Sequence, residues 1–245
     1  MGVAFDELTF SDALASITGM VEQGAGGYIV TPNPEMIYAC RKEPALAALL
    51  NGAALVVPDG IGVIHASRIL GTPLPERVPG IELGEQLAAW MARHEKRLYL
   101  LGAKPGVAER AAENLKTLFP GLNIVGTHDG YFQDEAPVVE ALHKAAPDVI
   151  FVCMGFPRQE RFMSAHRQEF PHSVMLGLGG SLDVFSGEVR RAPAVFRKCG
   201  MEWFYRLLCD PRRMGRMMKL PVFLWLVLCE RVRPQKEGRG KHGCM

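Results

Sequence analysis

The stretch KRLYLLGAKPGVAERAAENLKTLF, residues 96–119, contains the unit from which the fold is predicted. Its first part, KRLYLLGA, is a short apolar run that ends near a glycine, which is typical of a buried strand. Its second part begins at a proline and continues as PGVAERAAENLKTLF, which predicts a helix. The stretch therefore predicts a buried strand that passes through a glycine-containing corner into a helix.

The same unit of strand and helix repeats along most of the chain. Further strands are predicted at residues 27–33, 54–60, 122–128, 148–155 and 173–180. Helices are predicted at residues 11–23, with Ser11 as the cap, and at 34–50, 61–70, 81–95, 135–146 and 157–170. Strands that are apolar throughout and are separated by helices indicate a parallel sheet covered on both faces. We therefore predict an α/β fold with a Rossmann-like, parallel-sheet core.

Charges are distributed unevenly along the chain. Residues 1–189 carry 14 Lys and Arg against 22 Asp and Glu, whereas residues 190–245 carry 14 against 4. We therefore predict a core at 1–189 and a basic, amphipathic helical appendage at 190–245 with a disordered extreme C-terminus. The appendage is also rich in aromatic residues and methionine, which leaves two interpretations open. It is a helix lying in a membrane interface, or a helix pair packed on the core with a solvated basic face.

The remaining composition argues against several classes of protein. The acidic N-terminus, MGVAFDELTF, is unlike a signal peptide, and the apolar segment 220–229 is shorter than the roughly 20 residues of a membrane span. Six cysteines occur without a CxxC pair, which favours reduced thiols in a cytosolic protein. Because the chain contains neither HExxH nor DxD, no metal is predicted.

Polar side chains and glycines follow five of the predicted strands. Because ligands of a parallel α/β sheet bind beyond the carboxyl ends of its strands, these corners form the candidate site. The corners contain Thr31 and Asn33, Asp59, Gly102 and Gly106, Gln159 and Glu160, and Asp183. The sequence thus predicts that separate segments gather around one ligand.

Asp59, in the sequence PDGIG, is the only acid in its corner. Its apolar neighbours favour partial desolvation, which suits a general base, and the alternative is an N-cap of the following helix. Asn33 is predicted to cap the helix that starts at Pro34. Thr31 is not explained by capping and can face a ligand. Arg77, in a loop bracketed by prolines, can hold a phosphate or be a surface charge.

The other corner residues also have two interpretations. Gly102 and Gly106, in GAKPG, favour phosphate binding at a helix N-terminus or simply permit a tight turn. Gln159 can bind a ligand through its amide, whereas Glu160 is predicted only to complement a helix N-terminus. Asp183 can accept hydrogen bonds from a base or a sugar, or it can cap the next segment.

The motifs TPNPEM, PDGIGV, ERVPG, GFPRQERF, GLGGSLD and EWFYRLLCDPRR occur in this order. Together they resemble the WecG/TagA/CpsF family of bacterial glycosyltransferases. The resemblance implies an inverting, metal-independent enzyme without a cofactor. It would move N-acetylmannosamine from UDP to N-acetylglucosamine on undecaprenyl diphosphate, in teichoic acid or other cell-surface polysaccharide synthesis. N-acetylmannosaminuronic acid and glucose, each carried by UDP, are alternative donor sugars within the family.

The resemblance also implies roles for single residues. Asp59 matches the general base, Thr31 matches a second catalytic residue, and Arg77 matches a position near the diphosphate. Positions near UDP or its sugar are matched by Asn33, Gln159 and Asp183. The basic tail matches an appendage that docks on the cytoplasmic face of the plasma membrane and completes the active site when a homo-oligomer dissociates. Its candidate ligands for the diphosphate are Arg206, Arg212 and Arg213.

Two other classes of protein compete with this interpretation. A nicotinamide-dependent dehydrogenase requires GxGxxG after the first strand and an acid about 20 residues further on, and neither is found at GYIVTPNPE. A non-catalytic module that binds nucleotides or nucleic acid would use the basic tail, but it leaves Asp59 and Thr31 without a role. The predicted partners are therefore a UDP sugar, a lipid-diphosphate acceptor and a membrane surface, and not nucleic acid.

Overall fold

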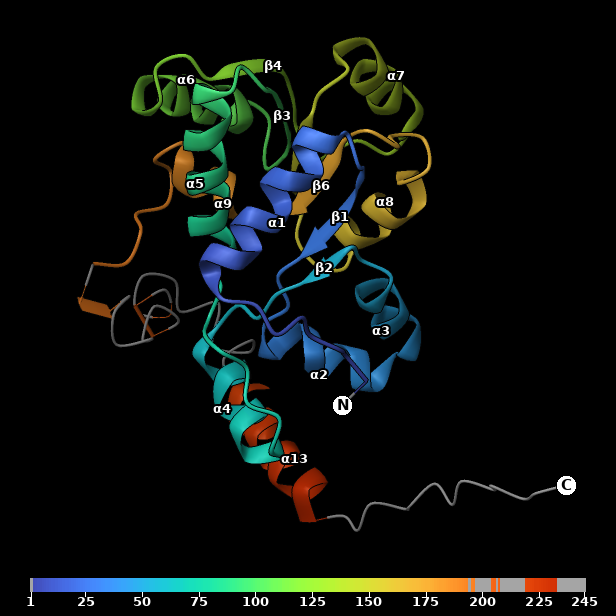
Figure 1. Ribbon diagram of the computed structural model, residues 1–245, viewed down its shortest axis with the longest axis vertical. Helices are drawn as coiled ribbons and strands as arrows, with labels where there is room; N and C mark the ends of the chain where they lie inside the picture. The colour runs from blue at the N-terminus through green and yellow to red at the C-terminus, as the bar shows by residue number, and fades with distance from the viewer. Residues whose placement is uncertain (1, 194, 197–203, 206, 208–218, 233–245) are drawn as a thin grey trace, which may run out of the picture.

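The computed structural model describes residues 2–193, 195–196, 204–205, 207 and 219–232. Within this part of the chain, six strands form one sheet in the order β2-β1-β6-β5-β3-β4 (Figure 1). Every neighbouring pair of strands is parallel, which confirms the predicted α/β core. The strands are β1 (Gly27–Val30), β2 (Leu55–Val56), β3 (Arg97–Gly102), β4 (Asn123–His128), β5 (Val149–Cys153) and β6 (Val174–Gly177).

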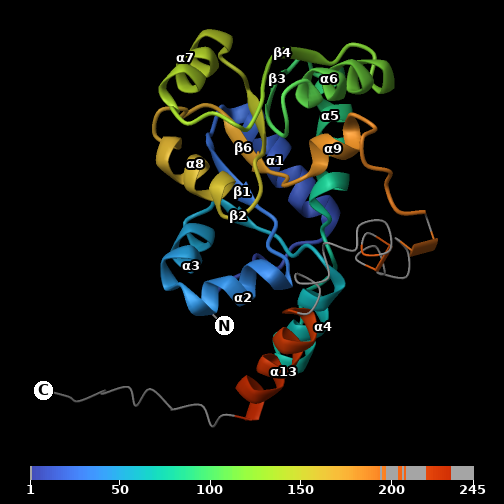
Figure 2. The ribbon, with the colours of Figure 1, turned by 180° about the vertical axis from the view of Figure 1, so that it is seen from behind.

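Helices cover both faces of the sheet (Figures 1 and 2). The helices that build the hydrophobic core of one face are α1 (Phe10–Gln23), α5 (Gly80–Arg93), α6 (Val107–Leu118) and α9 (Ser181–Phe185). Those that build the core of the other face are α2 (Pro34–Lys42), α3 (Pro44–Asn51), α7 (Ala136–Ala145) and α8 (Arg158–His166). Alternate residues of β3 enter the two cores: Leu98 and Leu100 enter the first, and Tyr99 and Leu101 the second. This two-sided burial explains why the strands are apolar throughout.

Two predicted elements differ from the structure. Residues 34–50 form two helices, because Glu43 is extended (φ −130°, ψ 95°) just before Pro44. A proline disfavours helical backbone at the residue that precedes it. The strand predicted at 54–60 is confined to Leu55–Val56. The N–H groups of Val57 and Asp59 still donate to the carbonyl oxygens of Val30 and Pro32, whereas Pro58 between them has no N–H to donate.

The predicted cap of α1 is also wrong. Thr9, and not Ser11, is the N-cap, and its hydroxyl oxygen accepts a hydrogen bond from the N–H of Asp12. The carboxylate of Asp12 accepts in turn from the N–H of Thr9, which completes a capping box. The helix therefore starts one residue before the predicted boundary.

The C-terminal helix α13 (Lys219–Val232) lies along α4 (Ile61–Leu70), as both views show (Figures 1 and 2). Phe223 and Val227 of α13 are buried against α4 and α2 in a third, smaller core. Large apolar side chains are exposed elsewhere on α13, at Val222, Trp225, Leu228 and Val232. The helix thus packs on the core, as one interpretation predicted, and presents an apolar outer face, which the other interpretation requires.

Other predictions about the C-terminal part remain predictions. Arg206, Arg212 and Arg213 lie outside the described residues, as does the extreme C-terminus that was predicted to be disordered. The division into a core at 1–189 and an appendage at 190–245 is likewise untested. None of the helices in the described ranges has the length and apolar character that crossing a membrane requires.

Candidate active site

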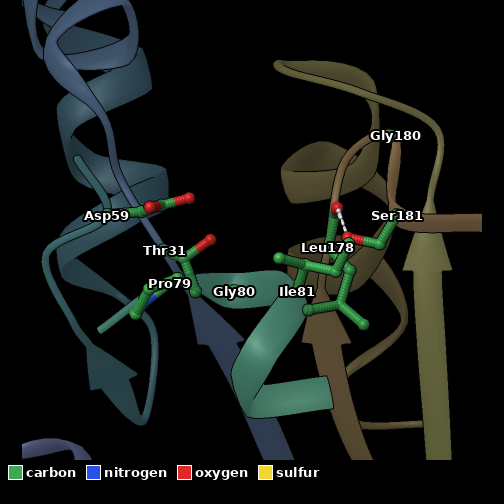
Figure 3. Close-up of a pocket in the computed structure, with 8 residues that line it drawn as sticks. All are labelled: Thr31, Asp59, Pro79, Gly80, Ile81, Leu178, Gly180 and Ser181. Carbon is green, nitrogen blue, oxygen red and sulfur yellow. Dashed lines mark hydrogen bonds between the residues drawn. The ribbon is translucent and has the colours of Figure 1, made fainter. Parts of the chain in front are cut away.

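The chain leaves β1 and β6, two neighbouring strands, toward opposite faces of the sheet. After β1 it passes to α2 on one face, and after β6 it passes to α9 on the other. Because the two loops diverge, a crevice is expected at the carboxyl ends of these strands. A pocket of about 70 Å³ lies there (Figure 3), lined by Thr31, Asp59, Pro79, Gly80, Ile81, Leu178, Gly180 and Ser181.

Backbone hydrogen bonds hold together the segments that form one side of this pocket. The N–H of Asp59 donates to the carbonyl oxygen of Pro32 at 3.0 Å. The N–H of Val78 donates to the carbonyl oxygen of Pro58 at 2.8 Å. The loop after β1, the corner after β2 and the loop before α5 are therefore tied to one another through main-chain atoms.

Asp59 points into the pocket from the corner after β2 (Figure 3). It is not the N-cap of α4, because that position belongs to Gly60, whose φ of 99° favours glycine. The capping interpretation of Asp59 is therefore wrong. The pocket also has apolar walls at Ile81 and Leu178.

Thr31 lies beside Asp59, and its hydroxyl is directed toward the same space (Figure 3). Its Oγ1 is 3.4 Å from the carbonyl oxygen of Gly177, the last residue of β6. A Cβ atom on Gly80 would lie 2.9 Å from this Oγ1, so the absence of a side chain at position 80 lets α5 begin beside Thr31. The structure thus brings together the two residues predicted to be catalytic.

Asn33 and Gln159 use their side-chain amides within the protein. Oδ1 of Asn33 accepts a 3.1 Å hydrogen bond from the N–H of Met36, which confirms that Asn33 caps α2. Gln159 is buried, and its Oε1 accepts from the N–H groups of Gly155 and Gly179 at 3.2 and 3.0 Å. Neither is among the described residues that line the pocket, and their contacts with UDP or its sugar stay predictions.

Glu160 lies in the first turn of α8, where it was expected only to complement the helix N-terminus. Its side chain is fully buried, and burial raises the pKa of its carboxyl group to about 7. Sequence reasoning missed this burial because Glu160 stands in the polar run RQER, which indicates a solvated helix start.

Arg77 and Asp183 lie near the pocket but do not line it, and each is two residues from a lining residue. Arg77 is half-buried and makes no hydrogen bond or ion pair with the residues that the structure describes. Asp183 is in the first turn of α9, and a Cβ atom on Gly180 would lie 3.3 Å from its Oδ2. Their predicted roles in binding UDP or its sugar remain predictions.

Gly102 is the last residue of β3 and Gly106 follows it, and β3 is separated from β1 by β5 and β6. Gly102 has a φ of 134°, and a side chain there would collide with the carbonyl oxygen of Cys153. Gly106 has a φ of 81° and is the N-cap of α6. These backbone conformations explain why both residues are glycine, and phosphate binding at this corner stays a prediction.

The thiols of Cys40 and Cys153 are unpaired and buried. Burial raises the pKa of Cys40 to about 11 and that of Cys153 to about 12. Neither thiol is therefore a nucleophile near neutral pH. The polar side chains that line the pocket are instead the carboxylate of Asp59 and the hydroxyls of Thr31 and Ser181.

The fold and the pocket define an α/β protein with a candidate ligand pocket beyond the carboxyl ends of its parallel strands, where a carboxylate and two hydroxyls stand near an apolar wall. Sequence reasoning missed this wall because it selected polar residues and glycines that follow strands. Ile81 stands at the start of the helix predicted at 81–95, and Leu178 lies within the strand predicted at 173–180. The motif GLGGSLD indicated the loop, but Asp183 was selected instead of Ser181.

Comparison with known proteins identifies the family. The model of the glycosyl transferase WecG/TagA/CpsF family matches residues 1–237, and the chain belongs to this family. A protein named N-acetylglucosaminyldiphosphoundecaprenol N-acetyl-beta-D-mannosaminyltransferase, from Bacillus spizizenii, is 40% identical over 86% of this chain and 82% of its own length. Proteins of the same name from Bacillus subtilis (strain 168) and Staphylococcus aureus (strain NCTC 8325) are each 38% identical. They cover 86% and 93% of this chain and 82% and 90% of their own lengths.

Proposed function

We propose that this protein transfers N-acetylmannosamine from UDP to N-acetylglucosamine carried on undecaprenyl diphosphate. The names of its relatives describe this sugar and this acceptor for those proteins. The observation that carries the proposal is the pairing of Asp59 with Thr31 in one pocket at the carboxyl ends of the strands. A carboxylate in this position is suited to take the proton of a sugar hydroxyl.

The proposed reaction is a single displacement that inverts the anomeric centre. The oxygen of the acceptor hydroxyl attacks the anomeric carbon from the face opposite UDP, and Asp59 takes the hydroxyl proton. As the new bond forms, the bond between the anomeric carbon and the diphosphate oxygen breaks, and its electron pair leaves with UDP. The hydroxyl of Thr31 supports this step by hydrogen bonding to the reacting groups.

Negative charge develops on the diphosphate as UDP leaves. We propose that positive groups of the protein meet this charge without a metal ion. Arg77 is the first candidate, because its guanidinium is half-buried near the pocket and has no partner among the described residues. The N-terminus of α6 at Gly106 is a second candidate. Residues of the basic tail are a third group: Arg206, Arg212 and Arg213.

A lipid-linked acceptor requires that the enzyme work at a membrane surface, and we propose the cytoplasmic face of the plasma membrane. Two features support docking through the C-terminal part. The outer face of α13 exposes Trp225, Leu228 and Val232, and residues 190–245 carry 14 Lys and Arg against 4 Asp and Glu. An apolar helix face within a basic segment is suited to an anionic lipid surface.

A panel of donors tests the proposal. The purified protein is incubated with a short-chain lipid diphosphate carrying N-acetylglucosamine and with the UDP derivatives of N-acetylmannosamine, N-acetylmannosaminuronic acid or glucose. We expect UDP release and a product of the right mass with the first donor, unchanged by EDTA, and an anomeric configuration opposite to that of the donor. Preference for another donor would correct the sugar, and loss of transfer in EDTA would contradict metal independence. No transfer with any donor would contradict the proposed function.

A further inference from the structure

Glu160 places a carboxyl group inside a hydrophobic core. Its side chain is fully buried, and it interacts electrostatically with Tyr28 of β1 and Cys40 of α2. Its Oε2 has no hydrogen-bond partner among the described residues. Burying a carboxyl group costs free energy unless its oxygens are hydrogen-bonded, and here one of the two oxygens has no such bond. The presence of Glu160 therefore calls for an explanation other than packing.

The side chain of Glu160 contacts the side chain of Gln159. Its Oε1 accepts a 2.8 Å hydrogen bond from Nε2 of Gln159. The Gln159 amide also packs against the end of β6, since a Cβ atom on Gly177 would lie 2.9 Å from Nε2. Because Glu160 accepts the hydrogen bond of the NH₂ group, the carbonyl oxygen of the same amide points away from Glu160, toward the N–H groups of Gly155 and Gly179. Glu160 therefore fixes the orientation of the Gln159 amide.

The amide oxygen of Gln159 joins the loop after β5 to the loop after β6. It accepts hydrogen bonds from the N–H groups of Gly155 and Gly179 at 3.2 and 3.0 Å. Gly179 belongs to residues 178–181, the glycine loop, which supplies the pocket wall opposite Asp59 (Figure 3). A reversed amide would direct NH₂ at two N–H donors and would release this loop.

We infer that Glu160 is a positioning residue that holds the glycine loop in place through Gln159 and so sets the shape of the donor-sugar pocket. The inference rests on the proposed function, which makes this pocket the donor site. Glu160 acts without touching the substrate, because its side chain is fully buried. It thereby explains why a carboxyl group is kept in the core directly behind the site.

The same contacts predict that the glycine loop responds to pH. Burial raises the pKa of Glu160 to about 7, although its hydrogen bond with Gln159 opposes this rise. Tyr28 and Cys40 face it from β1 and α2, and burial raises the pKa of each, so both stay neutral near pH 7. Ionisation of Glu160 therefore changes the hydrogen bond to Gln159, and the amide transmits the change to the N–H of Gly179.

Three variants of the full-length protein test the inference: Glu160→Gln, Glu160→Leu and Glu113→Gln. Glu113 is an exposed acid of α6 and serves as the control. The first readout is the ¹⁵N–¹H amide resonance of Gly155 and of Gly179, followed from about pH 6 to about pH 8. The second is the KM for the donor at fixed pH, and the third is the melting temperature.

In the wild type and in Glu113→Gln, we expect both glycine amides to titrate with a midpoint near 7, and in Glu160→Gln we expect no titration. Glu160→Gln keeps an acceptor oxygen for Gln159, so its KM should stay near the wild-type value. Glu160→Leu offers no acceptor and should raise the KM for the donor roughly tenfold. Its melting temperature shows only whether the variant is folded, because Leu removes the cost of the buried carboxyl group but leaves the buried NH₂ group of Gln159 without an acceptor.

Titration of the glycine amides that persists in Glu160→Gln would overturn the inference, as would an unchanged donor KM in Glu160→Leu. The amide titration requires no substrate. If no UDP sugar reacts but the amides titrate through Glu160, the proposed function is wrong and the coupling of Glu160 to the glycine loop stands.

Discussion

The backbone N–H of Asp59 donates a 3.0 Å hydrogen bond to the carbonyl oxygen of Pro32, the residue after Thr31. This bond ties the corner after β2 to the loop after β1. The carboxylate and the hydroxyl that face the pocket (Figure 3) therefore come from two segments that are joined through main-chain atoms. Because the link uses only backbone atoms, the side chain of Asp59 can be changed without removing it.

Replacing Asp59 by Asn tests the general base. The amide has nearly the same size but cannot take a proton from the acceptor, so we expect kcat to fall by about 10²- to 10⁴-fold. The affinity for UDP, measured by titration calorimetry, should stay within about twofold, since the proposed role concerns the acceptor hydroxyl. Equal losses of kcat and UDP affinity would instead mark Asp59 as a residue that maintains the pocket.

Replacing Gly80 by Ala tests the placement of Thr31. The added methyl group would lie 2.9 Å from Oγ1 of Thr31, so either the hydroxyl of Thr31 or the start of α5 must move. We expect transfer to fall about tenfold or more, because small displacements of reacting groups are costly. Initial rates of UDP release at saturating substrate measure this effect.

Gly19→Ala is the matched control for Gly80→Ala. Gly19 lies within α1 with no atom near its would-be Cβ, so the substitution should stabilise the protein by roughly 0.5–1 kcal/mol and leave transfer unchanged. Chemical denaturation measures the first effect. If Gly80→Ala retains full transfer, the position of the Thr31 hydroxyl does not matter for catalysis.

The parallel sheet could be predicted from the sequence, and so could the clustering of the loops that follow its strands. Strands buried on both faces are apolar throughout, and the carboxyl ends of parallel strands meet at one edge, so Thr31 and Asp59 were expected to be neighbours. The role of Asn33 was equally accessible, because an N-cap followed by proline is a local signal that needs no tertiary contact.

Features that depend on tertiary contacts could not be predicted. Gln159 and Glu160 stand in a polar run, and only the packing of α8 against the sheet shows that both are buried. Asp59 had a general-base and a capping interpretation in the sequence, and only the structure, in which Gly60 is the N-cap of α4, removes the second. The helix α13 has apolar residues on both sides, so its sequence alone does not show which side faces the core.

The contacts of the His166 side chain predict that the free energy of unfolding depends on pH. Its Nε2 lies 2.8 Å from Glu135 and its Nδ1 lies 2.6 Å from Glu169. Burial lowers the pKa of His166, but its hydrogen bonds with the two carboxylates outweigh burial and raise the pKa above 6.5. Hydrogen bonding to His166 lowers the pKa of Glu169 below 4.5.

The sign of the pH effect follows from these two shifts. The contribution of His166 is fully present below its unfolded pKa of about 6.5 and is lost as pH rises through its higher folded pKa. That of Glu169 is present above about 4.5 and is lost at lower pH. We expect the urea midpoint of the wild type to fall between pH 5.5 and pH 8. The urea midpoint of His166→Gln should fall by less over the same range. Identical pH dependence in both proteins would contradict a stabilising role.

The buried and the exposed face of α13 predict different effects for two substitutions of aromatic residues. Trp225 is 63% exposed and Phe223 is 1% exposed, so Trp225→Ser should leave the fold intact, whereas Phe223→Ala should destabilise it by about 3–5 kcal/mol. If the outer face inserts into an anionic membrane, Trp225→Ser should lower partitioning to phosphatidylglycerol vesicles about tenfold in a sedimentation assay. Partitioning of the wild type should also weaken in high salt, because the basic segment contributes electrostatic attraction. Undiminished vesicle binding by Trp225→Ser would show that α13 does not dock through this face.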